Sequence, residues 1–135
     1  MNILVIFLSY EKAELIRRRA EAFLRNAEQL IAEREWDLAI FNLEQYCQLI
    51  LKYKLLVMRG SYPRTNSIRR LIRIIGEENP RLLELIEDER HLHYIARLEE
   101  AYIASRYLPY VYEEREVVDL YRFVVEVFRP YVEEI

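Results

Sequence analysis

The sequence predicts an all-α protein, an up-and-down bundle of four long helices plus a short helix, and three observations support this fold. The length of 135 residues is that of a single domain. The chain has two Gly and four Pro, which is little turn material for a sheet with many hairpins. Apolar residues recur at spacings of three and four over long stretches, the period of a helix. We therefore expect residues 1–135 to form one helical domain, with residues 1–9 as a short apolar lead.

The first two predicted helices are long and amphipathic. One runs from about Tyr10 to Arg34, with Ser9 as its N-cap. The other runs from about Asp37 to Arg59 and stops at Gly60. The apolar surface of the second helix is so wide that we expect this helix to be central and buried on more than one side. Its polar residues form a stripe: Asp37, Glu44, Gln48, Lys52 and Arg59.

Residues 60–67 form the clearest loop of the chain, because they combine Gly, Ser, Pro, Thr and Asn. A short helix is expected to follow, from about Ile68 to Ile75. Asn66 or Ser67 can cap its start, and Gly76 can close its end.

The last part of the chain predicts two further helical stretches. Asn79 followed by Pro80 is a helix start. This helix either continues to Arg106 or breaks near His91. The final helix is expected from about Glu113 to Tyr131, with Pro130 limiting its end.

Composition excludes several classes of protein. A net charge of -3 is not typical of a nucleic-acid-binding protein. The single cysteine, Cys47, cannot form a disulfide within the chain or a cysteine-based metal motif, which suits a reducing cytoplasm. No apolar run reaches the length of a membrane span, and residues 1–9 lack the features of a signal peptide. Frequent Glu, Arg, Ile and Tyr with little Gln suggest a thermophilic source.

A basic segment is the most informative local feature. Five arginines fall within fifteen residues with no acid among them: Arg59, Arg64, Arg69, Arg70 and Arg73. Arginine forks suit phosphate, and the helix start at Ser67 offers free backbone N–H groups. The alternative is a solvated helix face that pairs with Glu-rich stretches of a neighbouring helix or subunit.

Other reactive side chains predict little chemistry. His91 and His93 are two positions apart on a helix and point to different sides, so we expect no metal site. Cys47 lies on the most apolar helix and is interpreted as a structural thiol. The tyrosines of the C-terminal third, Tyr112 among them, can stack bases, pack or form an interface. No glycine pattern for a nucleotide cofactor is present, and none is expected.

Two stretches are similar to the HEPN domain, the "higher eukaryotes and prokaryotes nucleotide-binding" helical bundle. The first begins near the end of the first helix and continues through the second helix, with its Gln- and Lys-containing run, into the loop and the short helix. It comprises Ala27-Glu28-Gln29-Leu30, Trp36-Asp37-Leu38-Ala39, residues 43–56 and residues 62–72. The second is Ala104-Ser105-Arg106-Tyr107-Leu108-Pro109, which resembles an Arg-Tyr-Pro element before the last helix of the family.

The resemblance implies a bundle that is commonly dimeric and often encoded beside a small nucleotidyltransferase, in two-component or toxin–antitoxin systems. Some members are metal-independent ribonucleases that use an Arg and a His a few residues later, brought together across a dimer. Here Arg106 matches the Arg, but Tyr110, Val111 and Tyr112 stand where the His is expected. A phenol, with its high pKa, is a poor substitute for imidazole. Asn66 also replaces a His of the family's loop.

These departures favour binding over catalysis. We expect a nucleotide-binding and partner module, a homodimer that works with a nucleotidyltransferase and contacts nucleotide or RNA phosphate. The residues expected to contact phosphate are Lys52, Arg64, Asn66, Arg69, Arg70, Arg73 and Arg106. One alternative is a ribonuclease toxin with an altered centre on Arg106 and Tyr112. The other is a purely structural, dimeric interaction protein.

Overall fold

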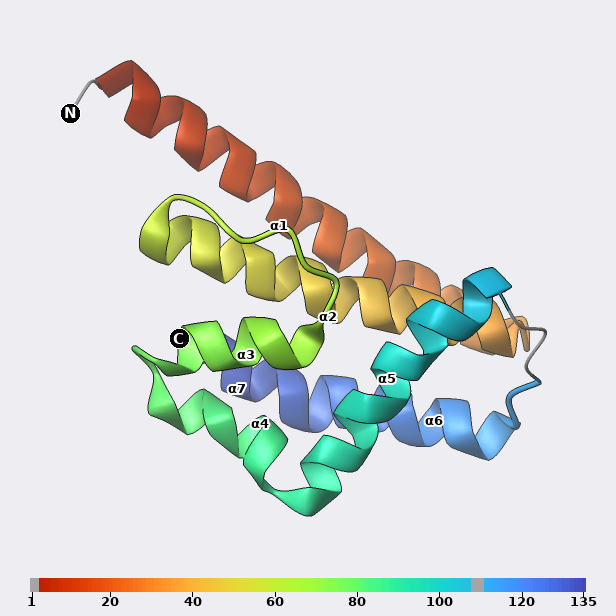
Figure 1. Ribbon diagram of the computed structural model, residues 1–135. Coiled ribbons are helices and arrows are strands. Elements are labelled where there is room, and N and C mark those ends of the chain that lie inside the picture. The colour runs from red at the N-terminus through yellow and green to blue at the C-terminus, as the bar shows by residue number, and fades with distance from the viewer. Residues whose placement is uncertain (1–2, 108–110) are drawn as a thin grey trace.

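The all-α bundle is confirmed by the computed structural model, which describes residues 3–107 and 111–135, without the side chains of residues 6, 7 and 105–107. Helices α1 (Ile3–Ala32) and α2 (Trp36–Arg59) form a long antiparallel pair (Figure 1). The remaining elements follow in order: α3 (Ile68–Gly76), η1 (Pro80–Leu83), α4 (Glu84–Glu87), α5 (Glu89–Tyr107), α6 (Glu114–Phe123), η2 (Val124–Phe128) and α7 (Arg129–Glu133).

Helix α1 begins earlier than predicted. It starts at Ile3, so Ser9 lies inside the helix and is not its N-cap, and residues 3–9 are helical and not a separate lead. Leu and Ile are compatible with a helix interior, and no Gly or Pro precedes Ser9 to stop the helix. This first part of α1 extends beyond the end of α2 (Figure 1).

Helix α2 is the central helix, as predicted. It contacts α1, α3, α5 and α6, and it carries buried residues on several sides. Its end at Gly60 is also confirmed: Gly60 has φ +79°, and its N–H donates to Leu56 O at 2.9 Å. That left-handed conformation suits glycine, which has no Cβ.

Helix α3 begins where a serine cap was expected. The Ser67 hydroxyl accepts a hydrogen bond from the Arg70 N–H at 3.1 Å, so Ser67, and not Asn66, is the N-cap. At the other end, Gly76 is the last residue of α3. A Cβ on Gly76 would lie 2.4 Å from Leu83 Cδ2, so a larger residue there would force the Leu83 side chain of η1 to move.

The stretch after Pro80 breaks at Asp88, close to the predicted alternative near His91. It forms η1 and α4, and then α5 starts at Glu89. The Asp88 carboxylate accepts the N–H groups of Arg90 at 2.9 Å and His91 at 3.3 Å, and these bonds lower the pKa of Asp88. Asp88 therefore caps α5, a role that the sequence reading did not assign.

The final helix does not end at Pro130. The chain passes from α6 through the π-helical turn η2 into α7, and Pro130 lies in the first turn of α7. A π-helical turn shifts the hydrogen-bond register, so the missing N–H of proline is tolerated there. None of the helices in the described parts of the chain combines the length and apolar character that crossing a membrane requires.

Candidate functional site

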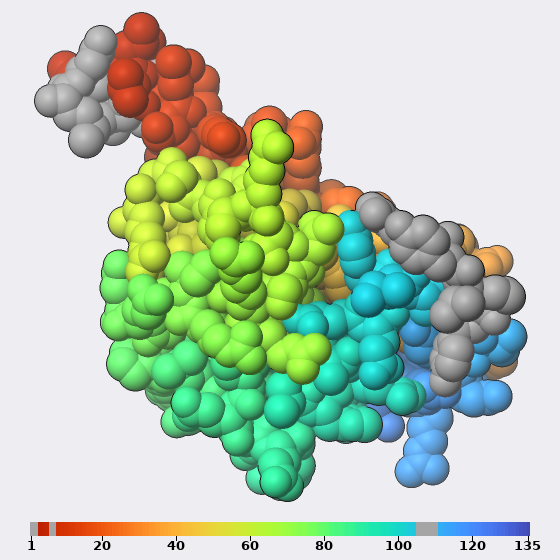
Figure 2. Space-filling view, in the orientation of Figure 1, coloured from red at the N-terminus to blue at the C-terminus, as the bar shows by residue number. Residues whose placement is uncertain are grey.

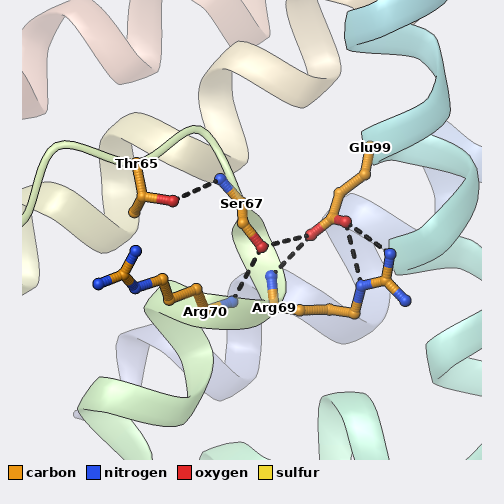
Figure 3. Close-up of polar contacts among 5 residues, drawn as sticks. All are labelled: Thr65, Ser67, Arg69, Arg70 and Glu99. Carbon is orange, nitrogen blue, oxygen red and sulfur yellow. Dashed lines mark hydrogen bonds and ion pairs between the residues drawn. The ribbon is translucent and has the colours of Figure 1, made fainter.

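The start of α3 is fastened to α5 by one carboxylate, Glu99 (Figure 3). Oε1 of Glu99 accepts the backbone N–H of Arg69 at 2.8 Å and the Ser67 hydroxyl at 3.3 Å. Oε2 accepts Nε and Nη2 of the Arg69 guanidinium at 3.0 and 2.8 Å. The side chain of Glu99 is 15% exposed, so this is a largely buried, charge-assisted contact.

Glu99 therefore occupies the helix N-terminus where a ligand phosphate was expected. The partial positive charge of the helix start and the Arg69 fork are both directed at this carboxylate. Arg69 was predicted to contact phosphate, and the structure places it in an ion pair within the protein. The acid that neutralises it lies 30 residues away in sequence, on another helix.

Arg59 is also neutralised within the chain. Its guanidinium forms ion pairs with Glu77 at 3.1 Å and Glu78 at 3.2 Å, and it donates to Ile74 O at 3.4 Å. These contacts agree with the alternative reading of the basic segment, in which arginines pair with neighbouring Glu-rich stretches. That reading holds for Arg59 and Arg69.

Three arginines of the basic segment have no such partner. The side chains of Arg64, Arg70 and Arg73 are exposed and make no hydrogen bond or ion pair with the described residues. Figure 3 shows Arg69 and Arg70 extending to opposite sides of α3. Asn66, also exposed, lies in the loop between Arg64 and the Ser67 cap. The loop and the outer side of α3 thus carry uncompensated positive charge.

The loop that carries Arg64 and Asn66 is held at its end by side chains. The Thr65 hydroxyl accepts the Ser67 N–H at 3.1 Å, and the Ser67 hydroxyl is fixed between Arg70 N–H and Glu99 (Figure 3). Such local bonds stabilise turns that precede a helix. We name the surface formed by Arg64, Asn66, Arg70 and Arg73 the arginine surface.

The predicted polar stripe of α2 does not face solvent along its whole length. Glu44 and Gln48 are buried, with exposures of 0% and 3%, whereas Asp37 and Arg59 are exposed. Gln48 Nε2 donates to both carboxyl oxygens of Glu44, at 3.0 Å to Oε2, and Gln45 Nε2 donates at 3.3 Å. Burial raises the pKa of Glu44 to about 8, and the charge of Glu99 adds to this rise.

Lys52 continues this row toward the surface. Its Nζ lies 3.5 Å from Gln48 Oε1 and 5.5 Å from the centre of the Tyr62 ring. Burial lowers the pKa of Lys52, and the charge of Glu44 opposes that change. Lys52 was expected to bind phosphate, but it is half-buried and faces the tyrosine of the loop.

The structure describes the side chain of only one of the two candidate catalytic residues, Arg106 and Tyr112. Arg106 belongs to α5, but its side chain lies outside the described residues, as does all of Tyr110. Tyr112 is 8% exposed and packs in the hydrophobic core. A buried phenol is poorly placed to meet RNA from solvent.

The remaining predicted positions are structural in character. Cys47 is fully buried, and burial raises the pKa of its thiol. His91 packs against the rings of Phe123 and Tyr131. In the described part of the chain, no cluster of three or more His, Cys, Asp or Glu residues could hold a metal ion.

The sequence did not predict the roles of the two carboxylates described above, those of Glu44 and Glu99. Glu44 was placed in a polar stripe, and Glu99 was not singled out. The spacing of Glu44, Gln48 and Lys52 by four residues was the available signal, because it puts three polar groups on one face of the most apolar helix. No local signal could have paired Glu99 with Arg69.

The match to known proteins agrees with this architecture. A family model described as "HEPN domain" matches residues 13–135, which is nearly the whole chain. No curated protein matched the sequence. The chain therefore belongs to the HEPN domain family.

Proposed function

We propose that this HEPN domain is a binding module that contacts nucleotide or RNA phosphates through the arginine surface. The observation that carries the proposal is the difference among the arginines. Arg59 and Arg69 are paired with acids, whereas Arg64, Arg70 and Arg73 are exposed and make no ion pair with the described residues. Exposed guanidinium forks are suited to bidentate contact with phosphate oxygens.

The protein as a whole has a small net negative charge and repels polyanions weakly. Binding of a phosphate therefore depends on a local basic surface. The net charge is -3, but no acid lies between residues 59 and 73. At physiological ionic strength charges farther than about 8 Å are largely screened, so a phosphate at this surface senses mainly the nearby arginines. Arg106 follows Glu99 by seven residues, two turns along α5, and we include it as a further candidate contact.

Catalysis is not part of the proposal. The positions that would supply a His after Arg106 hold Tyr and Val, and Tyr112 lies in the core. General acid–base catalysis near neutral pH needs a group whose pKa is close to neutral and which can reach the substrate. Degradation of RNA by the purified protein, lost on Arg106→Ala, would contradict this view and restore the ribonuclease alternative.

A nucleotidyltransferase partner remains a proposal supported by the family resemblance. A tagged pull-down from lysate of the source organism, followed by mass spectrometry, tests it. Recovery of a nucleotidyltransferase at near-equal amount is the expected result. Recovery of the chain alone would remove the partner from the proposal and leave phosphate binding to be tested on the isolated protein.

Binding can be measured by fluorescence anisotropy of a labelled single-stranded RNA, with ATP as competitor to distinguish oligonucleotide from nucleotide. Arg70→Glu plus Arg73→Glu should weaken binding at least about tenfold. The slope of log K against log salt should become shallower by about 1.4 if two phosphate contacts are lost.

The control for this variant is Arg115→Glu plus Arg122→Glu on α6. Both residues are exposed and make no side-chain ion pair with the described residues, so the control makes the same change in net charge elsewhere. Equal weakening by the two variants would show a general charge effect and contradict the assigned surface. No binding by the wild-type chain would favour the purely structural alternative.

A further inference from the structure

The start of α1 exposes several apolar side chains to solvent. Residues 3–8 are apolar without interruption, and the first charged residue is Glu11. Four of them are between 51% and 82% exposed: Ile3, Leu4, Val5 and Leu8. This part of α1 extends beyond the rest of the molecule (Figures 1 and 2). An exposed apolar segment of this kind marks a surface that meets another apolar body.

These apolar side chains point in several directions around the helix. At about 100° per residue, the three successive residues Ile3, Leu4 and Val5 are spread over roughly 200° of the helix circumference. A protein groove receives one face of a helix, at steps of three and four residues, and leaves the opposite face polar. Apolar exposure on several sides is instead typical of a helix that a uniformly apolar medium surrounds, such as the acyl chains of a bilayer.

The length of the segment limits how deeply it can enter a bilayer. Residues 3–10 form about 12 Å of helix at 1.5 Å per residue. The hydrocarbon core of a bilayer is about 30 Å thick, so this segment can enter one leaflet without crossing it. Tyr10 follows the apolar stretch and is 66% exposed, and tyrosine favours the boundary between acyl chains and headgroups. We therefore expect the segment to lie in the membrane interface.

Basic residues continue the apolar surface along one face of α1. Five exposed residues follow one another at steps of three and four and fall within an arc of about 80°: Leu4, Leu8, Lys12, Leu15 and Arg19. The two cations make no ion pair with the described residues of their own chain. One acid, Glu11, borders this arc. Cations beside an apolar stretch attract the anionic headgroups of phospholipids, and their aliphatic stems can lie along apolar surface.

We propose that the start of α1 binds the surface of an anionic phospholipid membrane. Residues 3–8 enter the acyl boundary, Tyr10 lies at the level of the headgroups, and Lys12 and Arg19 contact lipid phosphates. A short apolar segment alone gives weak and reversible membrane binding, so the cations beside it supply the second contribution that stable attachment needs. The proposal is independent of RNA binding at the arginine surface, which lies on the loop and on α3.

Co-sedimentation of the full chain with lipid vesicles tests the proposal. The wild type should bind vesicles of phosphatidylcholine and phosphatidylserine more tightly than vesicles of phosphatidylcholine alone. Leu8→Glu should lower the partition coefficient at least about tenfold, because a carboxylate would have to enter the acyl boundary. Leu38→Glu is the matched control: Leu38 is 49% exposed, lies at the start of α2, and should leave binding unchanged.

A charge variant tests the contribution of the cations. Lys12→Glu plus Arg19→Glu should remove the preference for vesicles that contain phosphatidylserine, because two contacts to lipid phosphate are lost. Arg115→Glu plus Arg122→Glu makes the same change in net charge on α6 and should keep that preference. Equal loss in the two variants would show a general charge effect and contradict the assigned contacts.

A fluorescent label tests insertion itself. Cys47 is fully buried, so a thiol-reactive, polarity-sensitive dye can be attached selectively to a Leu8→Cys variant. Its emission should move to shorter wavelengths when vesicles are added, whereas the same dye on Leu38→Cys should not respond. Circular dichroism checks that each variant folds. A wild type that does not bind the anionic vesicles, binding insensitive to Leu8→Glu, or a dye at position 8 that stays in water would each overturn the proposal.

Discussion

Glu44 is the residue whose environment departs most from that of an ordinary surface acid. Its carboxyl group is fully buried on α2 and is contacted by the amides of Gln48 and Gln45. Burial disfavours the charged form and raises the pKa of Glu44, and the charge of nearby Glu99 raises it further, whereas the hydrogen bonds from Gln48 and Gln45 and the charge of Lys52 oppose this rise. The protonated carboxyl is therefore the stable form in the folded protein up to a pH of about 8.

This protonation links stability to pH. Below pH 4.5, the ordinary pKa of a glutamate carboxyl, Glu44 is protonated in both the folded and the unfolded chain. The stability that depends on its protonation is then fully present. Between pH 4.5 and about 8 the unfolded chain ionises while the folded chain keeps its proton, so stability falls as pH rises. The contribution of this group to the slope is about 1.4 kcal/mol per pH unit.

Glu44→Gln should remove that slope. Urea unfolding followed by circular dichroism at pH 5, 6, 7 and 8 gives the free energy of unfolding of both proteins. The variant should gain stability relative to the wild type as pH rises, because an amide does not ionise. Glu133→Gln, at an exposed position, is the control and should show no such trend. A difference between Glu44→Gln and wild type that is constant across this range would contradict the account of Glu44.

At the scale of secondary-structure elements, a helix end was predicted correctly where one residue determines it, and wrongly where several residues together determine it. Gly60 and Ser67 end α2 and start α3, because a left-handed backbone and an N-cap hydroxyl are local properties. Ser9 offered the same hydroxyl, yet α1 runs through it, since helix-compatible residues precede it. Pro130 failed as a stop because η2 alters the hydrogen-bond register before it.

The contact between α3 and α5 is a tertiary feature that no local pattern encodes. Arg69 and Glu99 lie on different helices, and their pairing depends on how α5 crosses the start of α3. The sequence identified the five arginines of the basic segment. The positions of Glu77, Glu78 and Glu99 in space determine which of these arginines remain available for a ligand.

A double-mutant cycle measures this contact. Arg69→Ala, Glu99→Ala and the double variant should give a coupling free energy of roughly 1 kcal/mol, discounted for the partial exposure of Arg69. The same cycle on the exposed pair Arg81 and Glu134, at 2.8 Å, serves as the control and should give a value near zero. Equal coupling in the two cycles would show that the ion pair between the Arg69 and Glu99 side chains contributes no more than a surface pair does.

At the scale of the whole molecule, an acidic helical bundle presents a local basic surface at one loop and one short helix. The central α2 gives the bundle its core, and Glu99 fixes the start of α3 against α5. This arrangement holds the loop that carries Arg64 and Asn66 while Arg70 extends away from Glu99 (Figure 3). The fold class followed from the length, the few Gly and Pro residues and the helical periodicity, but the site required the three-dimensional pairing of charges.

The most direct test of phosphate binding at the arginine surface is an NMR titration of the ¹⁵N-labelled protein with a short single-stranded RNA, observing the Nε–H signals of the arginine side chains. We expect the signals of Arg64, Arg70 and Arg73 to shift with a common affinity, while those of Arg59 and Arg69 stay close to their starting positions because Glu77, Glu78 and Glu99 already hold them. Shifts confined to Arg115 and Arg122, or no saturable shift at all, would contradict the central claim that the unpaired arginines of the loop and α3 bind phosphate.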